Sequence, residues 1–290
     1  MDRLKNAFAP IINYFDDDEV IEIIINSNGS LWTDTLTSGL IEVGTVNYHD
    51  VDYLIRQVAD YNNTVINYQN PRLECILPFN QERFSALKYI VKSPAVTIRK
   101  KPILIPLVNY IERGTLSAKQ YEQILELVLS NKNIGIVGAT SSGKSTLANS
   151  ILDVIATNCP SQRMLIIEDT AELQYNNNNV EFFLTTNEFD LNYCLKSAMR
   201  FRPSRIIVGE LRDGHTAWGL LKALNTGHSG GLFTLHANNC FDALNIRLPQ
   251  LLTEVLTVKQ DTIIKQTIDA IISIQKEDNI RKVQEIYLNK

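Results

Sequence analysis

A glycine-rich segment carries the clearest chemical signal in the chain. It reads Gly138-Ala-Thr-Ser-Ser-Gly143-Lys144-Ser145 and matches G-x-x-x-x-G-K-[ST] at every fixed position. In such a loop the backbone N–H groups point at a phosphate, the lysine adds positive charge near the β- and γ-oxygens, and the serine ligates Mg²⁺. An apolar strand precedes the loop, and the helix expected over Thr146–Ile155 adds its N-terminal dipole. We therefore expect ATP and Mg²⁺ to bind through Gly138, Ala139, Thr140, Ser141, Ser142, Gly143, Lys144, Ser145 and Thr146.

Two further apolar runs end in acidic residues. Leu165-Ile-Ile leads into Glu168 and Asp169, and Arg205-Ile-Ile-Val-Gly leads into Glu210. The carboxyl ends of parallel strands form the edge at which nucleotides bind in doubly wound folds. Phosphoryl transfer to water needs positioning and charge neutralisation more than covalent chemistry. We expect Glu210 to serve the metal, together with Ser145, and to orient the attacking water, with Glu168 or Asp169 sharing that role. The alternative is that these acids are simply solvated.

Two histidines flank a glycine turn and a short apolar strand. The segment runs from Thr226 to Asn238 and contains His228 before the strand and His236 after it. His236 ends its strand at the same predicted edge as Glu210, so we expect it to contact the γ-phosphate. His228 is a weaker candidate for cofactor binding, because a lone histidine more often has a structural role.

These residues need a mainly parallel sheet to bring them together. From Ser117, which is placed to cap an amphipathic helix, apolar strand patterns alternate with helical ones. That alternation implies crossover connections and parallel strands. The expected strands are Asn133–Val137, Met164–Ile167, Ile206–Val208 and Leu232–Leu235, with edge strands at Ile268–Ile274 and Val283–Leu288. The Asn176–Asn179 run is expected to be a solvated loop.

The first hundred residues have the pattern of a smaller α+β domain. A short opening helix is expected over Leu4–Ile12, and Asp50 is placed to cap a second helix. Asn28-Gly29, between two β-branched runs, predicts a hairpin in which both turn residues have positive φ. Three more strands of one antiparallel sheet are expected at Leu73–Leu77, Arg83–Tyr89 and Ala95–Arg99.

Prolines mark the predicted domain boundary. Pro102 and Pro106 interrupt regular structure, because proline cannot donate to a ladder or continue a helix. The chain is therefore expected to have an N-terminal domain at 1–100, a linker at 101–116 and a P-loop domain at 117–290.

Composition limits the class of protein. The formal charge is −4, with 28 basic and 32 acidic residues, which argues against dedicated sequence-specific nucleic-acid binding. The four cysteines follow no metal-ligand or disulfide spacing, as expected in a reducing compartment: Cys75, Cys159, Cys194 and Cys240. Residues 1–6 lack the apolar core of a signal peptide, and no apolar run approaches the ~20 residues that cross a bilayer. We expect a cytoplasmic protein, peripheral at most on the inner face of the cytoplasmic membrane.

In their order along the chain, the motifs resemble those of the traffic ATPases of type II and type IV secretion systems. IIEDTAEL (166–173) is similar to the Asp box of that family, RIIVGELRD (205–213) to its Walker B block and TGHSGGLFTLHAN (226–238) to its His box. Met199–Arg205 is similar to the arginine-rich segment before Walker B, although Ser204 stands where the family often has an acid. The short chain without a four-cysteine insertion most resembles the conjugal-transfer and type IV secretion branch.

The resemblance implies an α/β fold with a C-terminal RecA-like P-loop ATPase domain that works as a homohexamer. Nucleotide would lie between the two domains, with arginines supplied by the N-terminal domain or across a subunit interface. Arg99, Arg200 and Arg212 are the expected nucleotide-binding arginines, and Arg83 and Arg202 are further candidates. The alternative for each is a surface salt bridge. The implied partners are inner-membrane and cytoplasmic components of a secretion or conjugation channel.

The function these motifs favour is that of an ATP-hydrolysing motor that energises type IV secretion or conjugal DNA transfer. A pilus assembly or retraction ATPase would share the same nucleotide core. A small-molecule kinase would need an acceptor pocket and a lid. A nucleotide-gated scaffold at the base of a channel would tolerate the loss of Glu210, which is present here.

Overall fold

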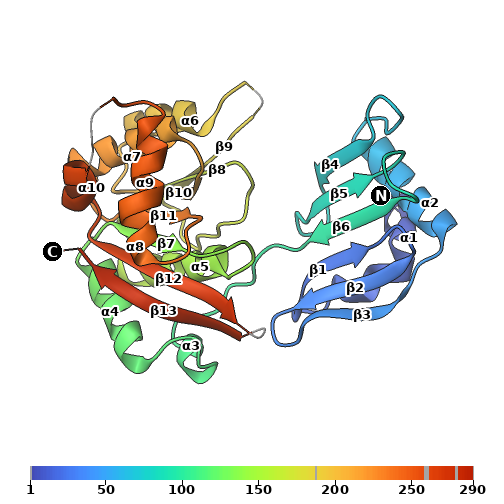
Figure 1. Cartoon of the computed structure of the whole chain (residues 1–290), viewed down its shortest axis with the longest axis horizontal. Coiled ribbons are helices and arrows are strands. Elements are labelled where there is room, and N and C mark those ends of the chain that lie inside the picture. The colour runs from blue at the N-terminus through green and yellow to red at the C-terminus, as the bar shows by residue number, and fades with distance from the viewer. Residues whose placement is uncertain (1, 187, 258–260, 278–279, 290) are drawn as a thin grey trace. The chain divides into compact units, whose positions relative to one another are not determined.

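The chain divides into two compact units. The computed structural model describes residues 2–186, 188–257, 261–277 and 280–289 (Figure 1). Unit 1 ends at Ile103 and unit 2 begins at Leu104, inside the segment 101–116 that the sequence assigned to a linker. Residues 104–116 contain the short helix α3 (Asn109–Glu112), and the side chain of Tyr110 is buried. Most of the expected linker therefore belongs to unit 2.

Unit 1 is an antiparallel sheet covered by helices. The strand order is β3-β2-β1-β6-β5-β4, and every neighbouring pair is antiparallel. The strands are β1 (Val20–Ile25), β2 (Ser30–Thr35), β3 (Gly39–Thr45), β4 (Arg72–Ile76), β5 (Arg83–Leu87) and β6 (Ala95–Arg99). The helices are α1 (Asp2–Ala7), the 3-10 helix η1 (Ala9–Tyr14) and α2 (Tyr48–Tyr61). The predicted α+β character is confirmed, whereas β3 was not expected.

Local differences in unit 1 have simple causes. The opening helix ends at Ala7 and a 3-10 helix containing Pro10 follows, because proline lacks the N–H that an α-helix would use. Only Gly29 in the first hairpin has positive φ, at 85°, so the prediction that Asn28 shares this conformation was wrong. Instead, the Gly29 N–H donates to Asn26 O in a longer loop.

The cap of α2 also differs from the prediction. Asn47 caps this helix by accepting a hydrogen bond from the Asp50 N–H at 2.9 Å, so Asp50 lies in the first turn and is not the cap. The apolar face of the helix is buried as expected, through Val51, Leu54, Ile55 and Val58.

Unit 2 is a seven-stranded sheet with the order β13-β12-β7-β11-β10-β8-β9. All neighbours are parallel except β12 and β13, which confirms the expected mainly parallel sheet. The strands are β7 (Ile134–Val137), β8 (Met164–Glu168), β9 (Val180–Leu184), β10 (Arg205–Leu211), β11 (Leu232–Leu235), β12 (Ala270–Glu277) and β13 (Ile280–Leu288). Of the two expected edge strands, only β13 is at an edge; β12 pairs with β7 as well. The other edge is β9, which was not predicted.

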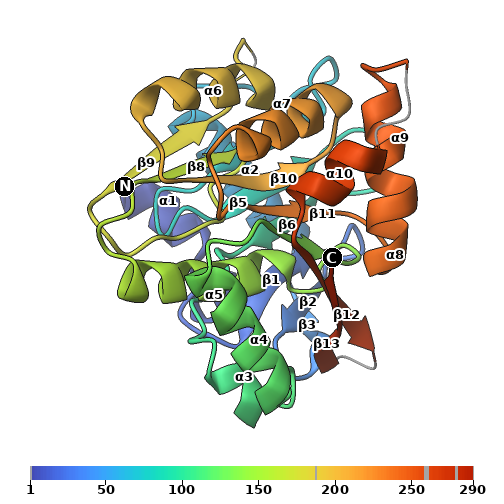
Figure 2. The same ribbon diagram turned by 90° about the vertical axis from the view of Figure 1, so that its left-hand side faces the viewer.

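Helices cover both faces of this sheet, as Figure 2 shows. One face carries α4 (Ala118–Leu129) and α5 (Lys144–Asn158), and the other carries α6 (Leu191–Ala198) and α7 (Gly214–Asn225). Ser117 caps α4 as predicted, in a reciprocal pair of hydrogen bonds with Gln120. The remaining short helices are η2 (Met199–Phe201), α8 (Cys240–Asp242), the π-helix η3 (Ala243–Arg247), α9 (Leu248–Thr253) and α10 (Asp261–Thr267).

The strand order of unit 2 gathers the predicted chemistry at one edge. Strands β7, β11, β10 and β8 are consecutive neighbours and run in the same direction. Their carboxyl ends lead to the P-loop, His236, Glu210 and Glu168 respectively. Every residue of β7 and β8 is buried, as expected for strands covered on both faces.

Two further observations concern the cysteines and the helices. Cys75, Cys159, Cys194 and Cys240 are all free thiols. None of the helices in the described ranges combines the length and apolar character that a bilayer crossing would require.

Candidate active site

The P-loop connects β7 to α5 through backbone that only small residues allow. A Cβ on Gly138 would lie 2.2 Å from the carbonyl oxygen of Ile274 in β12, so the strand and the loop need glycine here. Gly143 has φ +100°, and a Cβ on it would lie 3.1 Å from Cδ of Arg281. Because Gly143 is also the N-cap residue of α5, the backbone N–H groups at the end of the loop are those of the first turn of the helix.

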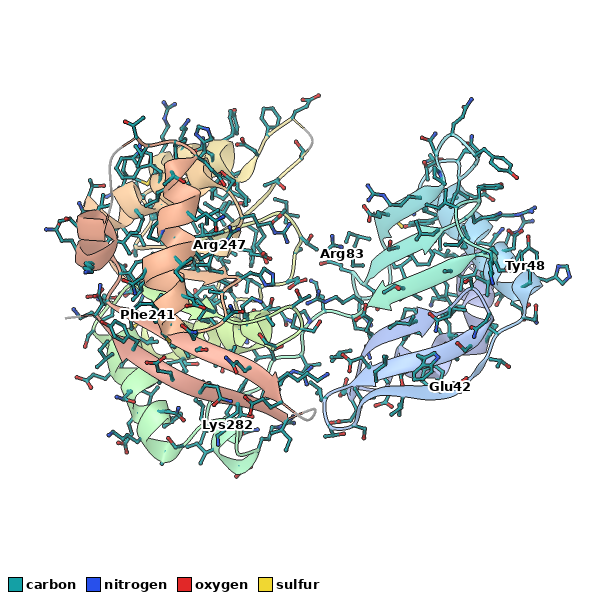
Figure 3. The ribbon with its side chains drawn as sticks, viewed as in Figure 1. Glu42, Tyr48, Arg83, Phe241, Arg247 and Lys282 are labelled. Atoms are coloured by element: carbon teal, nitrogen blue, oxygen red, sulfur yellow. The ribbon has the colours of Figure 1, made fainter. Side chains whose placement is uncertain are left out.

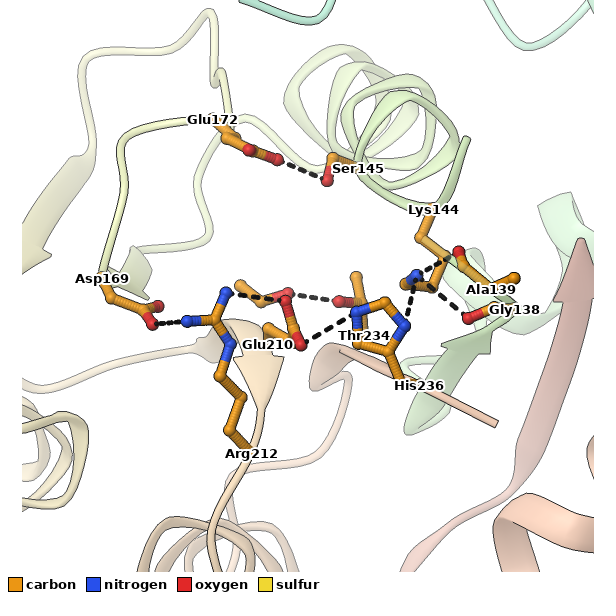
Figure 4. Close-up of polar contacts among 11 residues, drawn as sticks. Gly138, Ala139, Lys144, Ser145, Asp169, Glu172, Glu210, Arg212, Thr234 and His236 are labelled. Carbon is orange, nitrogen blue, oxygen red and sulfur yellow. Dashed lines mark hydrogen bonds and ion pairs between the residues drawn. The ribbon is translucent and has the colours of Figure 1, made fainter. Parts of the chain in front are cut away.

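Lys144 is folded back over this loop. Its Nζ donates to the carbonyl oxygens of Gly138 at 3.0 Å and Ala139 at 2.7 Å, and lies 3.3 Å from Nδ1 of His236 (Figure 4). The side chain is buried, with 7% of the residue exposed. The structure thus brings the predicted lysine and the predicted histidine together at the mouth of the P-loop.

Glu210 lies at the centre of a row of interacting polar side chains at the carboxyl ends of the strands. Its Oε1 is 3.2 Å from Nε2 of His236, and its Oε2 accepts from Arg212 at 3.0 Å. The same guanidinium donates to Asp169 at 2.6 Å (Figure 4). Arg212 therefore bridges the carboxyl ends of β10 and β8, and fixes the Glu210 carboxylate between a guanidinium and an imidazole.

Burial and neighbouring charges set the protonation states of Glu210 and His236. Burial by itself raises the pKa of Glu210, but the hydrogen bond and charge of Arg212 and the nearby His236 and Lys144 lower it below its usual value. Burial and the adjacent Lys144 ammonium lower the pKa of His236, against the opposing pull of Glu210. At neutral pH, His236 is therefore neutral and Glu210 is ionised. A neutral ring that accepts from Lys144 at Nδ1 has its proton on Nε2, from which it donates to Glu210.

A second acid approaches the P-loop from the end of β8. Ser145 Oγ donates to Glu172 Oε2 at 2.7 Å, and the side-chain amide of Asn149 in α5 donates to the Glu172 carbonyl at 3.1 Å. Glu172 stands in the acidic block that ends β8, but sequence reasoning assigned it no role. The hydroxyl expected to bind Mg²⁺ is thus paired with a carboxylate from the segment after β8, a strand that β11 and β10 separate from β7 in the sheet.

This chain is similar to proteins of known families. A family model described as "Type II/IV secretion system protein" matches residues 69–281. The chain is 38% identical over 273 residues to a probable conjugal transfer protein TrbB of Sinorhizobium fredii (strain NBRC 101917 / NGR234), covering 93% of this chain and 83% of that one. The chain belongs to the type II/IV secretion family. The resemblance drawn from the four motifs is therefore confirmed.

A second relative and a solved structure extend the comparison. The type IV secretion system protein VirB11 of Bartonella quintana (strain Toulouse) is 27% identical over 328 residues, covering 96% of this chain and 90% of that one. The X-ray structure of the Legionella pneumophila ATPase DotB aligns with TM-score 0.71 at 19% identity, covering 99% of this chain and 80% of DotB. That likeness concerns the fold alone, and it agrees with the predicted fold class.

Glu168, expected to act in catalysis, is a buried acid that binds backbone N–H groups after β8. Only 3% of the residue is exposed, and Oε1 accepts from the backbone N–H groups of Glu172 at 3.1 Å and Leu173 at 2.9 Å. These bonds reverse the chain after β8 and point Glu172 toward Ser145. Glu168 therefore contacts the backbone of the segment that carries Glu172, while His236 lies directly at the P-loop and contacts Glu210.

Other predicted residues lie elsewhere in the fold. His228 precedes β11 and Arg200 precedes β10, so both lie at the amino ends of these strands, across the sheet from the P-loop of the same chain. Arg99 ends β6 in unit 1, where it is paired in register with Arg83 on one side and Glu22 on the other. Figure 3 shows the Arg83 side chain at the start of β5. Two of the three expected nucleotide-binding arginines, Arg200 and Arg212, belong to unit 2. Of these two, Arg212 lies at the same edge of the sheet as the P-loop.

Glu168 predicts a pH dependence of stability. Burial raises its pKa from 4.5 to about 7, against the opposing effect of the two amides. Between these values the folded protein binds more protons than the unfolded one, so this contribution to stability is fully present below pH 4.5 and is lost as pH rises toward 7. The free energy of unfolding of the wild type should fall as pH rises through this range. In Glu168→Gln we expect this fall to be smaller by up to about 3 kcal/mol. Denaturant unfolding at about pH 5 and about pH 8 measures it. An equal decline in both proteins would contradict the assignment.

Gly209 predicts a packing effect at the same place. A Cβ on Gly209 would lie 2.9 Å from Cγ of Glu168, so glycine before Glu210 leaves room for the buried acid. We expect Gly209→Ala to lower the free energy of unfolding by about 1–3 kcal/mol through overpacking. The loss should be smaller in a Glu168→Ala background, because the colliding atom is then absent. Additive losses in the double variant, measured by denaturant unfolding, would show that the effect has another origin.

Proposed function

We propose that this protein is an ATP-hydrolysing motor that energises a type IV secretion or conjugal DNA transfer system. One observation carries the proposal: Lys144, His236 and Glu210 are linked in a chain at the P-loop, and Ser145 of the same loop is paired with Glu172. A loop that binds triphosphate thus meets an ionised carboxylate that can orient water. Both parts are required for hydrolysis.

The site residues divide the work of hydrolysis between them. The amides at the start of α5 and the Lys144 ammonium would bind the β- and γ-phosphates. Lys144 reaches them by exchanging its hydrogen bonds to Gly138 and Ala139 for bonds to phosphate oxygens. Glu210 accepts a hydrogen bond from the attacking water, and Arg212 and His236 fix the direction in which its carboxylate points.

The oxygen donors near the P-loop fit Mg²⁺, which enters with ATP. A serine hydroxyl and carboxylates are the hard ligands that this ion prefers, together with phosphate oxygens and water. Ser145 would hold the ion directly, and Glu172, which already accepts from the Ser145 hydroxyl, would bind a water of the metal. Glu210, expected from sequence to serve the metal, would be a second carboxylate available to the metal or its water. Bound Mg²⁺ would neutralise the charge that develops on the phosphates.

The relatives support a transport role for the hydrolysis. A relative that is 38% identical over 273 residues is named a probable conjugal transfer protein, and another is named a type IV secretion system protein. We therefore place this motor at the base of such a channel, as a homohexamer at the inner face of the cytoplasmic membrane. Arg200 and His228 lie across the sheet from their own P-loop, so in a ring they would act on nucleotide only from a neighbouring subunit. Arg99 would act from unit 1.

Turnover measured against protein concentration tests this function. We expect ATP hydrolysis without any added acceptor, with a rate per chain that rises as sedimentation shows rings forming. Tight nucleotide binding with negligible hydrolysis at every concentration would favour a scaffold. Hydrolysis or transfer that depends on a small-molecule acceptor would favour a kinase.

A further inference from the structure

A groove runs between α6 and α7, away from the P-loop. Its cavity measures about 310 Å³. One wall carries Asn192, Lys196 and Met199, and the other carries His215, Trp218 and Lys222. On both walls the residues recur at spacings of three, four or seven, so each helix presents one continuous stripe. Figures 1 and 2 both show α6 and α7 side by side on the same face of the sheet.

The groove is positively charged in a chain that is negative overall. Lys196, Lys222 and His215 line it, and no acid is among the described residues that do. Acids stand at the start of each helix, outside the lining: Asp190 caps α6 by accepting from the Tyr193 N–H at 2.7 Å, and Asp213 caps α7 by accepting from the Thr216 N–H at 2.9 Å. The formal charge of the whole chain is −4. This surface therefore attracts an acidic partner.

The floor of the groove is apolar. Leu195 and Ala223 are buried beneath it, and Trp218 and Met199 are half-buried along its sides. Lys222 Nζ lies 5.2 Å from the centre of the Trp218 ring, so the lysine stem and the indole make one surface with a charged rim. A Cβ on Gly219 would lie 3.0 Å from Cδ2 of Leu195. Glycine at this position therefore lets the helices approach and leaves the trough open.

The length of the groove indicates the form of the ligand. The α7 stripe runs from His215 to Thr226, which corresponds to about 16 Å of helix, or three turns. A small anion would use only one end of such a trough. Two facing helical stripes with an apolar floor suit a third helix, whose own stripe would lie between them.

We propose that the α6–α7 groove binds an amphipathic helix of a partner protein, with apolar residues facing the trough and acidic residues facing Lys196, Lys222 and His215. The proposal does not depend on ATP hydrolysis, because the groove is built from the helices that cover the sheet. It provides this motor with a site at which a channel component could dock while the P-loop edge remains free for nucleotide.

A designed peptide tests the proposal on the full chain. The probe is a fluorescein-labelled peptide of about 15 residues with leucines at helical spacing and glutamates elsewhere, long enough to form a helix on binding. Its controls are a scrambled peptide of the same composition and a peptide with lysines in place of the glutamates. We expect saturable binding by fluorescence anisotropy for the acidic helix alone. In a Trp32→Phe background, the fluorescence of Trp218, then the single tryptophan, should change at the same concentrations.

Matched variants locate the binding. Lys196→Glu with Lys222→Glu should weaken it at least about tenfold, whereas Lys119→Glu with Lys282→Glu, which reverses two exposed lysines elsewhere, should not. Gly219→Met should also weaken binding by filling the trough, if the charge variant proves unstable by thermal unfolding. The proposal is overturned if the acidic helix shows no saturation up to about 1 mM. It is equally overturned if the scrambled or basic peptide binds as well, or if both charge reversals have the same effect.

Discussion

Replacing Lys144 by alanine is expected to abolish ATP hydrolysis, with a loss of at least about a hundredfold in rate. Lys144 is the cation within the P-loop, and its Nζ lies 3.3 Å from the histidine that contacts Glu210. Without Lys144, the phosphate oxygens would lose an electrostatic interaction with the ammonium group. This interaction becomes stronger as negative charge builds up while the bond to the leaving group breaks. Release of inorganic phosphate at saturating ATP and Mg²⁺ measures the effect.

A matched lysine separates this effect from a general loss of charge. Lys119→Ala removes an exposed cation from α4 and should leave hydrolysis unchanged. Thermal unfolding checks that Lys144→Ala remains folded, since the substitution also removes hydrogen bonds to Gly138 and Ala139. A folded Lys144→Ala protein that hydrolyses ATP within a few fold of the wild type would refute the assignment of the P-loop.

Glu210→Gln is expected to stop hydrolysis and leave nucleotide bound. The amide keeps the shape of the side chain, but it lacks the charge that draws a proton of the attacking water, a contribution of about 10²–10⁴ in rate. Since the phosphate contacts come from the loop and Lys144, affinity for ATP should be retained or increased. Hydrolysis and retention of labelled ATP on the same protein measure both properties.

Glu181→Gln is a suitable control, because this glutamate is exposed on the edge strand β9. It should hydrolyse ATP at the wild-type rate. If Glu210→Gln turned over ATP normally, the water-orienting role would have to pass to another acid. Glu172 would then be the first candidate, since it is bonded to Ser145.

Much of this site follows from local sequence, and the reason is topological. A P-loop between an apolar strand and a helix, and acids directly after apolar runs, identify strand ends without knowledge of the partners of each strand. Parallel pairing then brings those ends to one edge, so Lys144, Glu210 and His236 were correctly expected to meet there. The fold class followed from the same alternation of strands and helices.

The parts that sequence could not predict depend on contacts distant along the chain. Glu172 reaches Ser145 because Glu168, buried under Gly209, turns the backbone after β8. The spacing of apolar residues in the sequence does not predict that turn. His228 shares a motif with His236, but a strand separates them, so they lie at opposite edges of the sheet. Strand β9 escaped prediction because it is a half-exposed edge strand, in which the alternation of buried and exposed residues is weak.

The claim on which the rest depends is that this P-loop binds Mg·ATP beside Glu210. Isothermal titration of the wild-type chain with a non-hydrolysable ATP analogue, with and without Mg²⁺, tests it most directly. We predict saturable binding that is tighter with the metal, and that is lost in Lys144→Ala but kept in Glu210→Gln. A folded protein that shows no binding of the analogue with Mg²⁺ present, or binding indifferent to Lys144, would contradict the account.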